Sequence, residues 1–254
     1  MRRVALLVLA ITAATGAARA ERLTVAVSTP EVAISSNFAG TPVTVFGVIE
    51  GDSAGAGAAG AYKVAILVLG PTESVVARRK DRVLGVWANR AARTIGRAPA
   101  FYSLTTSDTL DTIANPAVLQ RLQIGFDNIG FVFDGRTGAS DPEAKEFRDA
   151  FIRLKQQAGL YEQQQNVGFV GNLIFRSSAF LPANIPVGRY TVLAYLFSGG
   201  ELIGHAQDRI EVSKTGFEGT MAAFARNQSL VYGVLCAALA LFVGWLGGVI
   251  FRRD

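Results

Sequence analysis

Short apolar runs separated by turn residues fill the chain between residues 22 and 107. Several of these runs alternate apolar with polar positions and are rich in Val, Ile and Thr, a pattern typical of half-buried β-strands. The sequence predicts strands at 23–28, 32–36, 41–51, 62–70, 73–80, 82–89 and 100–106, with the fifth and sixth on either side of Asp81. About seven strands with no helical run between them favour an antiparallel sandwich. The small-residue segment 53–61 predicts a loop between two of these strands.

The spacing of apolar residues becomes helical between about residues 108 and 160. Residues 109–125 carry apolar side chains at three- and four-residue steps, and Pro116 predicts either a break or a late start of the helix there. A clearer helix is predicted from Asp141 to Gly159, capped by Ser140 or Asp141. Its apolar stripe is Phe147, Ala150, Phe151, Leu154 and Ala158. We expect this segment to pack on the sandwich.

Strands return at 171–182 and 188–214, the latter as a hairpin that turns at Ser198-Gly199-Gly200. Tyr190 begins the hairpin after Ile185-Pro186-Val187-Gly188, as in immunoglobulin-like domains whose tyrosine bonds back to nearby backbone; a strand that merely begins with Tyr is the alternative. The predicted fold is therefore mainly β: an immunoglobulin-like antiparallel sandwich with one or two inserted helices.

The N-terminus has the features of a signal peptide. Arg2 and Arg3 precede an apolar core, and Ala18-Arg19-Ala20 matches an A-x-A cleavage site. The sequence thus predicts a signal peptide at 1–20, cleaved after Ala20, and a periplasmic domain at 21–215 with its helical insert at about 108–160. The protein would then lie in the bacterial inner membrane, with its large domain in the periplasm.

The C-terminus predicts a single transmembrane helix. Residues 229–251 carry no charge and are followed by Arg252 and Arg253, which indicates that the tail 252–254 is cytoplasmic. Residues 216–228 form the approach to the membrane. Gly244 and Gly248 make a G-x-x-x-G pair, which favours close packing against another helix.

Composition and charge restrict the chemistry. The chain has one His and one Cys among 254 residues, so it lacks the residues for a Cys/His metal cluster, and no metal site or cofactor is predicted. The net charge of +5 falls to +2 once the three arginines of the signal peptide are removed, which gives no support for nucleic-acid binding. His205 has no nucleophile motif near it, and Asp108, Asp111, Asp127 and Asp134 are scattered, so we identify no catalytic residue.

One segment is strongly basic. Seven Lys and Arg residues and one acid, Asp81, lie between Ser74 and Ser107. The candidate site for an anionic solute, anionic lipid headgroups or an acidic partner consists of Arg78, Arg79, Lys80, Arg82 and Trp87. Because alternate residues of a strand point to opposite faces, a solvated basic sheet face is the competing interpretation.

The runs VAISSNFAGTPVTVFGVIEG, ARRKDRVLGVWAN and LPANIPVGRYTV, with VSKTGFE before the terminal span, carry a family resemblance. Over residues 23–253 the chain resembles the alphaproteobacterial putative transmembrane proteins. The resemblance implies a signal peptide, a periplasmic domain and one C-terminal helix, and it supplies no catalytic residue. Genes of the family often lie beside permeases of the sulfite-exporter type, which implies a permease as partner.

Two hypotheses about function follow. In the first, the chain is a non-enzymatic accessory to a transporter, and its periplasmic domain binds a partner or an anionic solute. In the second, it is an envelope enzyme or assembly factor that acts on cell-wall or lipid substrates. The first needs no catalytic constellation, whereas the second requires converging acids or a His pair, so we favour the first.

Overall fold

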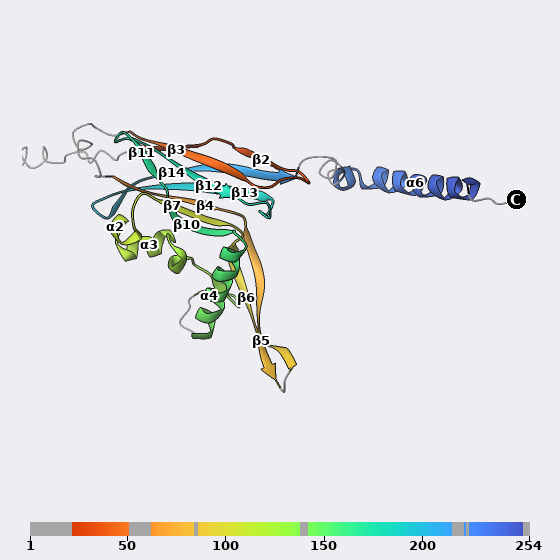
Figure 1. Ribbon diagram of the computed structural model, residues 1–254, viewed down its shortest axis with the longest axis horizontal. Helices are drawn as coiled ribbons and strands as arrows, with labels where there is room; N and C mark the ends of the chain where they lie inside the picture. The colour runs from red at the N-terminus through yellow and green to blue at the C-terminus, as the bar shows by residue number, and fades with distance from the viewer. Residues whose placement is uncertain are drawn as a thin grey trace, which may run out of the picture.

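Two β-sheets form the body of the molecule, and a long hairpin extends from it (Figure 1). The computed structural model describes residues 22–50, 62–83, 86–137, 142–214, 221 and 224–250, with side chains for all of these except 81, 83, 86–90, 136, 137, 249 and 250. The predicted signal peptide, the loop at 53–61, the helix cap at Ser140 or Asp141 and the tail 252–254 lie outside the described residues.

The first sheet is antiparallel throughout. Its strands, in spatial order, are β1 (Arg22–Val27), β3 (Thr41–Glu50), β12 (Ile174–Leu181) and β11 (Gly168–Val170). Strand β3 buries alternate residues, including Val43, Val45 and Ile49, as a strand with one face in the core does. Gly47 pairs with Phe175 of β12, whose ring lies where a Cβ at position 47 would be, so this position requires glycine.

The second sheet is mixed. Its strands, in spatial order, are β10 (Tyr161–Gln165), β7 (Tyr102–Thr106), β4 (Lys63–Leu69), β13 (Gly188–Ser198), β14 (Glu201–Lys214) and β2 (Glu31–Ile34). The four central strands are antiparallel, whereas β10 and β2 join the two edges in parallel. The mainly β sandwich predicted from the sequence is confirmed, and the two parallel edges are an addition that the apolar pattern did not indicate.

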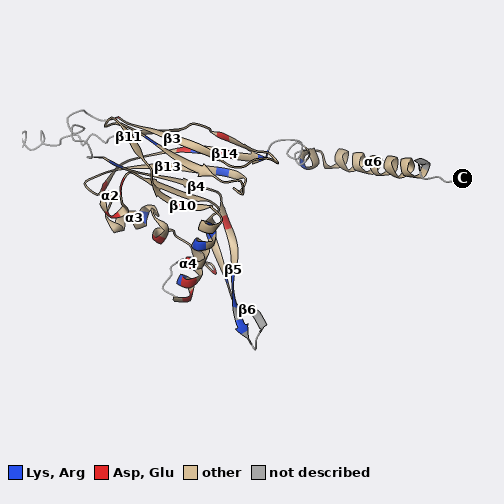
Figure 2. Cartoon of the chain, viewed as in Figure 1, with Lys and Arg blue, Asp and Glu red and all other residues tan. Residues whose placement is uncertain are grey.

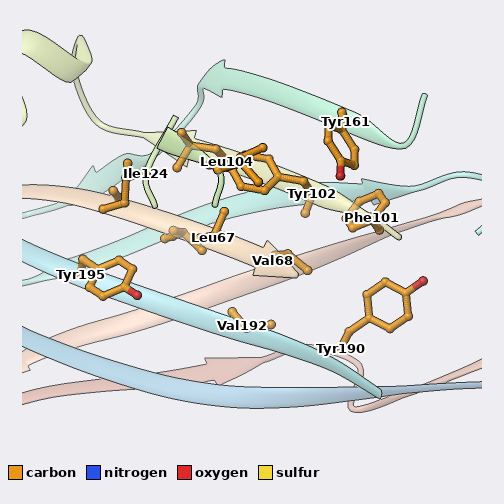
Figure 3. Packing of buried hydrophobic residues seen from close by; sticks show 14 of the residues in the cluster. Leu67, Val68, Phe101, Tyr102, Leu104, Ile124, Tyr161, Tyr190, Val192 and Tyr195 are labelled. Atoms are coloured by element: carbon orange, nitrogen blue, oxygen red, sulfur yellow. The ribbon is translucent and has the colours of Figure 1, made fainter. Parts of the chain in front are cut away.

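Strand β4 is buried from Val64 to Val68 without alternation, because both faces of the second sheet are covered. One face packs on the first sheet. The other lies under α2 (Leu110–Ile113), α3 (Pro116–Leu122), the 3-10 turn η1 (Phe126–Asn128) and α4 (Pro142–Gln157). Figure 3 shows this layer, where Leu67, Leu104 and Tyr102 meet Ile124.

The helical insert agrees with the predicted pattern in most respects. Of the two alternatives at Pro116, the structure has the break: the chain leaves the helical conformation at Asn115, and two short helices form instead of one. In α4, Phe147 and Phe151 are buried as expected, but Leu154 is 64% exposed and Ile152 is buried in its place. The apolar stripe is therefore rotated toward Ile152, and the assignment of Leu154 and Ala158 to the packed face is wrong.

The hairpin between β13 and β14 has the predicted turn and corner. Gly199 and Gly200 both have positive φ, as the two central residues of a type I′ hairpin turn require. The Tyr190 hydroxyl donates a hydrogen bond of 2.6 Å to the carbonyl oxygen of Pro186, four residues upstream. The tyrosine corner predicted from the sequence is confirmed.

A third sheet contains the long hairpin. Its strands are β5 (Thr72–Val83), β6 (Val86–Pro99), β8 (Val132–Phe133) and β9 (Arg136–Thr137). Strand β5 continues through Asp81 to Val83, so the prediction of a strand end at Asp81 is wrong. Figure 1 shows the hairpin leaving the sandwich beside α4, while α6 (Ser229–Ile250) extends from the end of the sandwich.

Candidate functional site

The predicted basic residues lie on the outer part of the β5–β6 hairpin. Arg78, Arg79, Lys80 and Arg82 are exposed residues of β5 (Figure 2). Trp87 lies on β6 opposite Arg82, and its side chain is outside the described part of the structure. The hairpin thus carries the basic residues away from the sandwich.

Strand alternation divides these residues between two faces. Glu73 and Arg79 face α4: Glu73 Oε1 lies 2.5 Å from Lys155 Nζ, and Arg79 Nη1 lies 3.1 Å from Glu146 Oε2. Arg78, Lys80 and Arg82, at even positions, project from the opposite face, which we call the basic face. The structure therefore separates Arg79 from the other three residues.

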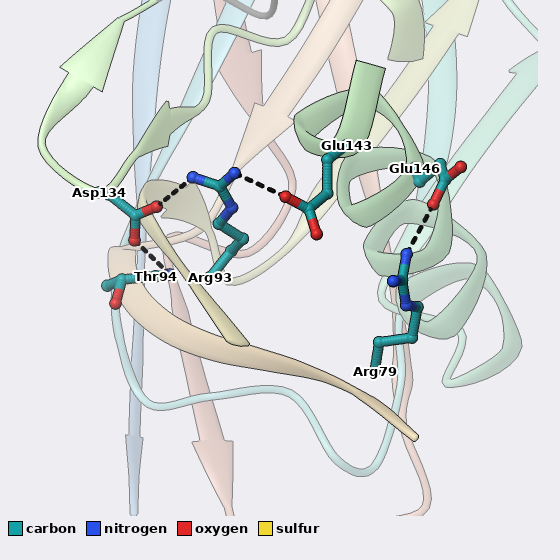
Figure 4. Close-up of polar contacts among 6 residues, drawn as sticks. All are labelled: Arg79, Arg93, Thr94, Asp134, Glu143 and Glu146. Carbon is teal, nitrogen blue, oxygen red and sulfur yellow. Dashed lines mark hydrogen bonds and ion pairs between the residues drawn. The ribbon is translucent and has the colours of Figure 1, made fainter. Parts of the chain in front are cut away.

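Arg93, another residue of the basic segment, joins three elements of the fold. Its guanidinium lies 2.9 Å from Asp134 Oδ2 after β8 and 2.7 Å from Glu143 Oε2 on α4 (Figure 4). Asp134 Oδ1 also accepts a hydrogen bond from the Thr94 backbone N–H. Because the charge of Arg93 is paired with two carboxylates, it fixes the hairpin to α4.

A cleft of about 660 Å³ lies at the base of the hairpin, against the helix-covered face of the second sheet. Three strands of the second sheet contribute apolar residues to its lining, with Leu67 and Leu69 on β4, Tyr102 on β7, and Leu193 and Tyr195 on β13. Further apolar residues come from β6, α3, β8 and the segment before β8. Its charged residues are Arg97, Arg121, Asp127 and Arg148.

Two tyrosines line this cleft in different ways. The Tyr102 hydroxyl donates a hydrogen bond to Gln123 O at 3.1 Å and accepts one from Gly125 N at 2.9 Å, which holds the α3–η1 segment against the sheet. The Tyr195 residue is only 8% exposed, but its hydroxyl is accessible from the cleft and has no hydrogen-bond partner among the described residues. Burial raises the pKa of both hydroxyls, so both are neutral at physiological pH.

The scattered carboxylates do not converge. Asp108 pairs with Lys63 at 3.0 Å, Asp127 lies 3.9 Å from Arg148, and Asp134 pairs with Arg93. A hydrogen bond from Lys63 lowers the pKa of Asp108 below its ordinary value. His205 is exposed on β14. Within the described residues no group of three His, Cys, Asp or Glu side chains could hold a metal ion.

The remaining predicted residues lie at the two ends of the chain. Ala18 and Ala20 are outside the described residues. Gly244 and Gly248 share one face of α6, and a Cβ added at either position meets nothing within 4 Å. Their face of the helix is therefore open to a neighbouring helix.

Sequence reasoning missed the cleft. The sequence indicates Arg97 and Tyr102 only as members of the basic segment, and it indicates no site at Arg121, Arg148 or Tyr195. The sequence predicts no strand between residues 90 and 99, so it gives no signal of the part of β6 that carries Arg97.

Helix α6 is the candidate membrane span, as residues 229–248 are long and apolar enough to cross a bilayer and none of that helix is buried in the described structure. A family model described as Putative transmembrane protein (Alph_Pro_TM) matches residues 22–253. Comparison with curated proteins gave no match. The family and the helix together support an integral membrane protein. Because the matched region covers nearly the whole chain, the chain belongs to this family of transmembrane proteins.

Proposed function

We propose that the chain is a single-pass inner-membrane protein whose periplasmic domain serves as the accessory of a transporter. The observation that carries the proposal is the basic face of the β5–β6 hairpin. Arg78 and Lys80 form no ion pair with any described residue, and with Arg82 they project from a hairpin that extends away from the sandwich. An exposed set of like charges of this kind suits an acidic surface on a partner.

The partner that we propose is a membrane permease with acidic periplasmic loops, of the sulfite-exporter type that the family resemblance implies. A domain held at the membrane by α6 meets such loops at high local concentration, so a modest charged contact is sufficient for association. Arginine suits this contact because its planar guanidinium binds a carboxylate through two hydrogen bonds.

Co-purification from membranes tests the proposal. We compare the parent with Arg78→Gln/Lys80→Gln/Arg82→Gln and with a control, Arg153→Gln/Arg176→Gln/Arg209→Gln, which removes three exposed charges from α4, β12 and β14. A permease should be captured by the parent and by the control but not by the hairpin variant. Because the contact is ionic and exposed, capture should also weaken as salt rises.

Two outcomes contradict the proposal. Equal capture of the permease by both triple variants would show that the basic face makes no contact. Capture of proteins that are not membrane permeases would remove the accessory role.

The Gly244/Gly248 face offers a second contact that the same assay can separate. Replacing both glycines with Leu closes the face to a neighbouring helix without adding charge. If this variant alone loses the permease, the membrane helix is the partner surface and the basic face is a solvated surface.

A further inference from the structure

We infer that the cleft at the base of the hairpin binds a small amphiphilic anion, which carries one carboxylate or phosphate on an apolar chain or ring. The inference concerns a second site, formed by residues other than those of the basic face, and it does not depend on the proposed permease. Three features of the cleft support it: its mixed lining, its uncompensated arginines and a tyrosine hydroxyl without a hydrogen-bond partner among the described residues.

The cleft has the size and the lining of a ligand site. Its volume of about 660 Å³ falls within the range typical of sites for small molecules. Leu67, Leu69 and Leu193 form an apolar floor on the second sheet, and the arginines come from the hairpin base, α3 and α4. An apolar body could therefore lie on the sheet while a charged group meets the arginines.

The charges of the cleft are not balanced. Arg97, Arg121 and Arg148 face a single carboxylate, that of Asp127. Arg148 is 13% exposed, lies 3.9 Å from Asp127 and donates a hydrogen bond of 2.6 Å to Phe126 O, so it is largely occupied. Arg97 and Arg121 are exposed and form no ion pair with any described residue. Two guanidinium groups are thus left to bind an anion.

Arg97 lies in a β-bulge, where its backbone has a conformation that is unfavourable for arginine. Glu73 pairs with Ala98 and Val75 with Ile95, so β6 has one residue more than β5 in this stretch, which is a β-bulge. Arg97 in the bulge has φ of +55°, a left-handed conformation that favours glycine. Bulges redirect side chains and are frequent beside functional sites, and strained residues gather at such sites too. The free energy of unfolding should therefore be lower with arginine at this position than with glycine.

Tyr195 supplies a neutral donor. It lies on the face of β13 that also carries Leu193, and both side chains line the cleft. Its hydroxyl has no hydrogen-bond partner among the described residues, and it is not one of the fully buried oxygens, so it is accessible from the cleft. An anionic oxygen bound between the arginines and the sheet would provide the missing acceptor.

Together these features select the ligand class. Guanidinium groups match the geometry of carboxylate and phosphate oxygens, and the leucine floor requires an apolar part. A small inorganic anion would leave the floor empty, and a neutral amphiphile would leave the arginines unused. The ligand should therefore need both parts.

Titration calorimetry on the full chain in phosphatidylcholine nanodiscs tests the inference, with empty nanodiscs as the blank. The probes are octanoate, octyl phosphate, octanol and acetate. Octanoate or octyl phosphate should bind at one site per chain. Octanol, which lacks the charge, and acetate, which lacks the apolar chain, should each bind at least about tenfold more weakly.

Variants locate the site. Arg97→Gly suits the local backbone and should fold, while Arg121→Gln is an exposed change on α3; each should weaken binding at least about tenfold. Tyr195→Phe should weaken it about three- to tenfold. The matched control is Arg153→Gln, which removes an exposed charge of α4 outside the cleft and should leave binding unchanged.

Changing the lipid of the nanodisc distinguishes between two sources of the ligand, the bilayer and the surrounding solution. Weaker octanoate binding in phosphatidylglycerol nanodiscs identifies anionic lipid of the bilayer as the occupant, and unchanged binding identifies a soluble amphiphile. Either result supports the site. The inference is overturned if neither anionic probe binds, or if Arg97→Gly and Arg121→Gln bind as tightly as Arg153→Gln. Loss of permease capture in the hairpin triple variant does not bear on it, so the two proposals can fail separately.

Discussion

Three buried tyrosines of the second sheet differ in how many hydrogen bonds their hydroxyls make. The Tyr102 hydroxyl makes two, to Gln123 O and from Gly125 N, and the Tyr190 hydroxyl makes one, to Pro186 O. The Tyr195 hydroxyl has no partner in the described residues. Replacing each with Phe removes one oxygen and keeps the ring, including the contact of Tyr190 with Phe101 at 5.8 Å. The series therefore isolates the hydrogen bonds from the packing.

The expected losses follow from the number of bonds. A neutral hydrogen bond contributes about 1 kcal/mol net, and an acceptor left without its donor adds to the cost where it is buried. We expect Tyr195→Phe to change the free energy of unfolding by less than about 0.5 kcal/mol, Tyr190→Phe to lower it by about 1 kcal/mol and Tyr102→Phe by about 2 kcal/mol. In a domain of this size 1 kcal/mol corresponds to a fall in Tm of about 2–4 °C.

Urea unfolding of the full chain in a nonionic detergent measures these differences. Near-UV circular dichroism follows the aromatic side chains of the domain and is insensitive to a membrane helix that stays folded. Tyr195→Phe is the internal control, since it makes the same chemical change on the same strand as Tyr190→Phe. If it costs as much as Tyr190→Phe, the hydroxyl partners do not explain the stability of the corner.

Three further predictions concern the topology, the ion pairs of Arg93 and the buried tyrosines. A reporter active only in the periplasm should work when inserted at residues 53–61 and fail when fused after Asp254; the reverse pattern would invert the proposed topology. Arg93→Gln should lower the free energy of unfolding by about 1–2 kcal/mol and increase proteolysis of the hairpin, because two partly exposed ion pairs to Asp134 and Glu143 are lost together. If the variant has the stability and the proteolysis rate of the parent, these ion pairs do not stabilise the hairpin. Burial raises the pKa of Tyr102, Tyr161 and Tyr190 above the unfolded value of about 10, so their contribution to stability is complete below about pH 10 and falls as the pH rises beyond it; equal urea midpoints at about pH 8 and about pH 11 would contradict this.

The strands and the corner could be predicted because their signals are local. Alternation within 41–51, the apolar run at 64–69 and the sequence before Tyr190 each determine a strand or a bond between residues close in the chain. In the same way, the turn residues Ser198, Gly199 and Gly200 predict the β13–β14 hairpin. The parallel edges formed by β10 and β2 depend on pairings between distant segments, which apolar periodicity does not encode.

The cleft could not be predicted for a similar reason. Its arginines come from a strand, a short helix and a long helix, at positions 97, 121 and 148. Nothing in the sequence distinguishes any of them from other arginines of the chain, and only the packing of α3 and α4 on the second sheet brings them together. The prediction for Leu154 is wrong because helical periodicity indicates that α4 has an apolar face but not which residues lie at its centre. In the structure Ile152 is buried in the core and Leu154 is exposed.

The place of β14 in the second sheet determines how the domain carries mechanical load. This 14-residue strand leads to the membrane helix, and it is held by β13 along its length and by β2 over Glu211–Lys214. In Figure 1 the strand points toward α6, so a pull from the membrane runs along the strand and across its hydrogen bonds. Bonds loaded in this direction share the force and must break together, whereas a strand pulled sideways loses them one at a time. The domain is therefore attached to its anchor in shear, the arrangement that best resists being torn from the membrane.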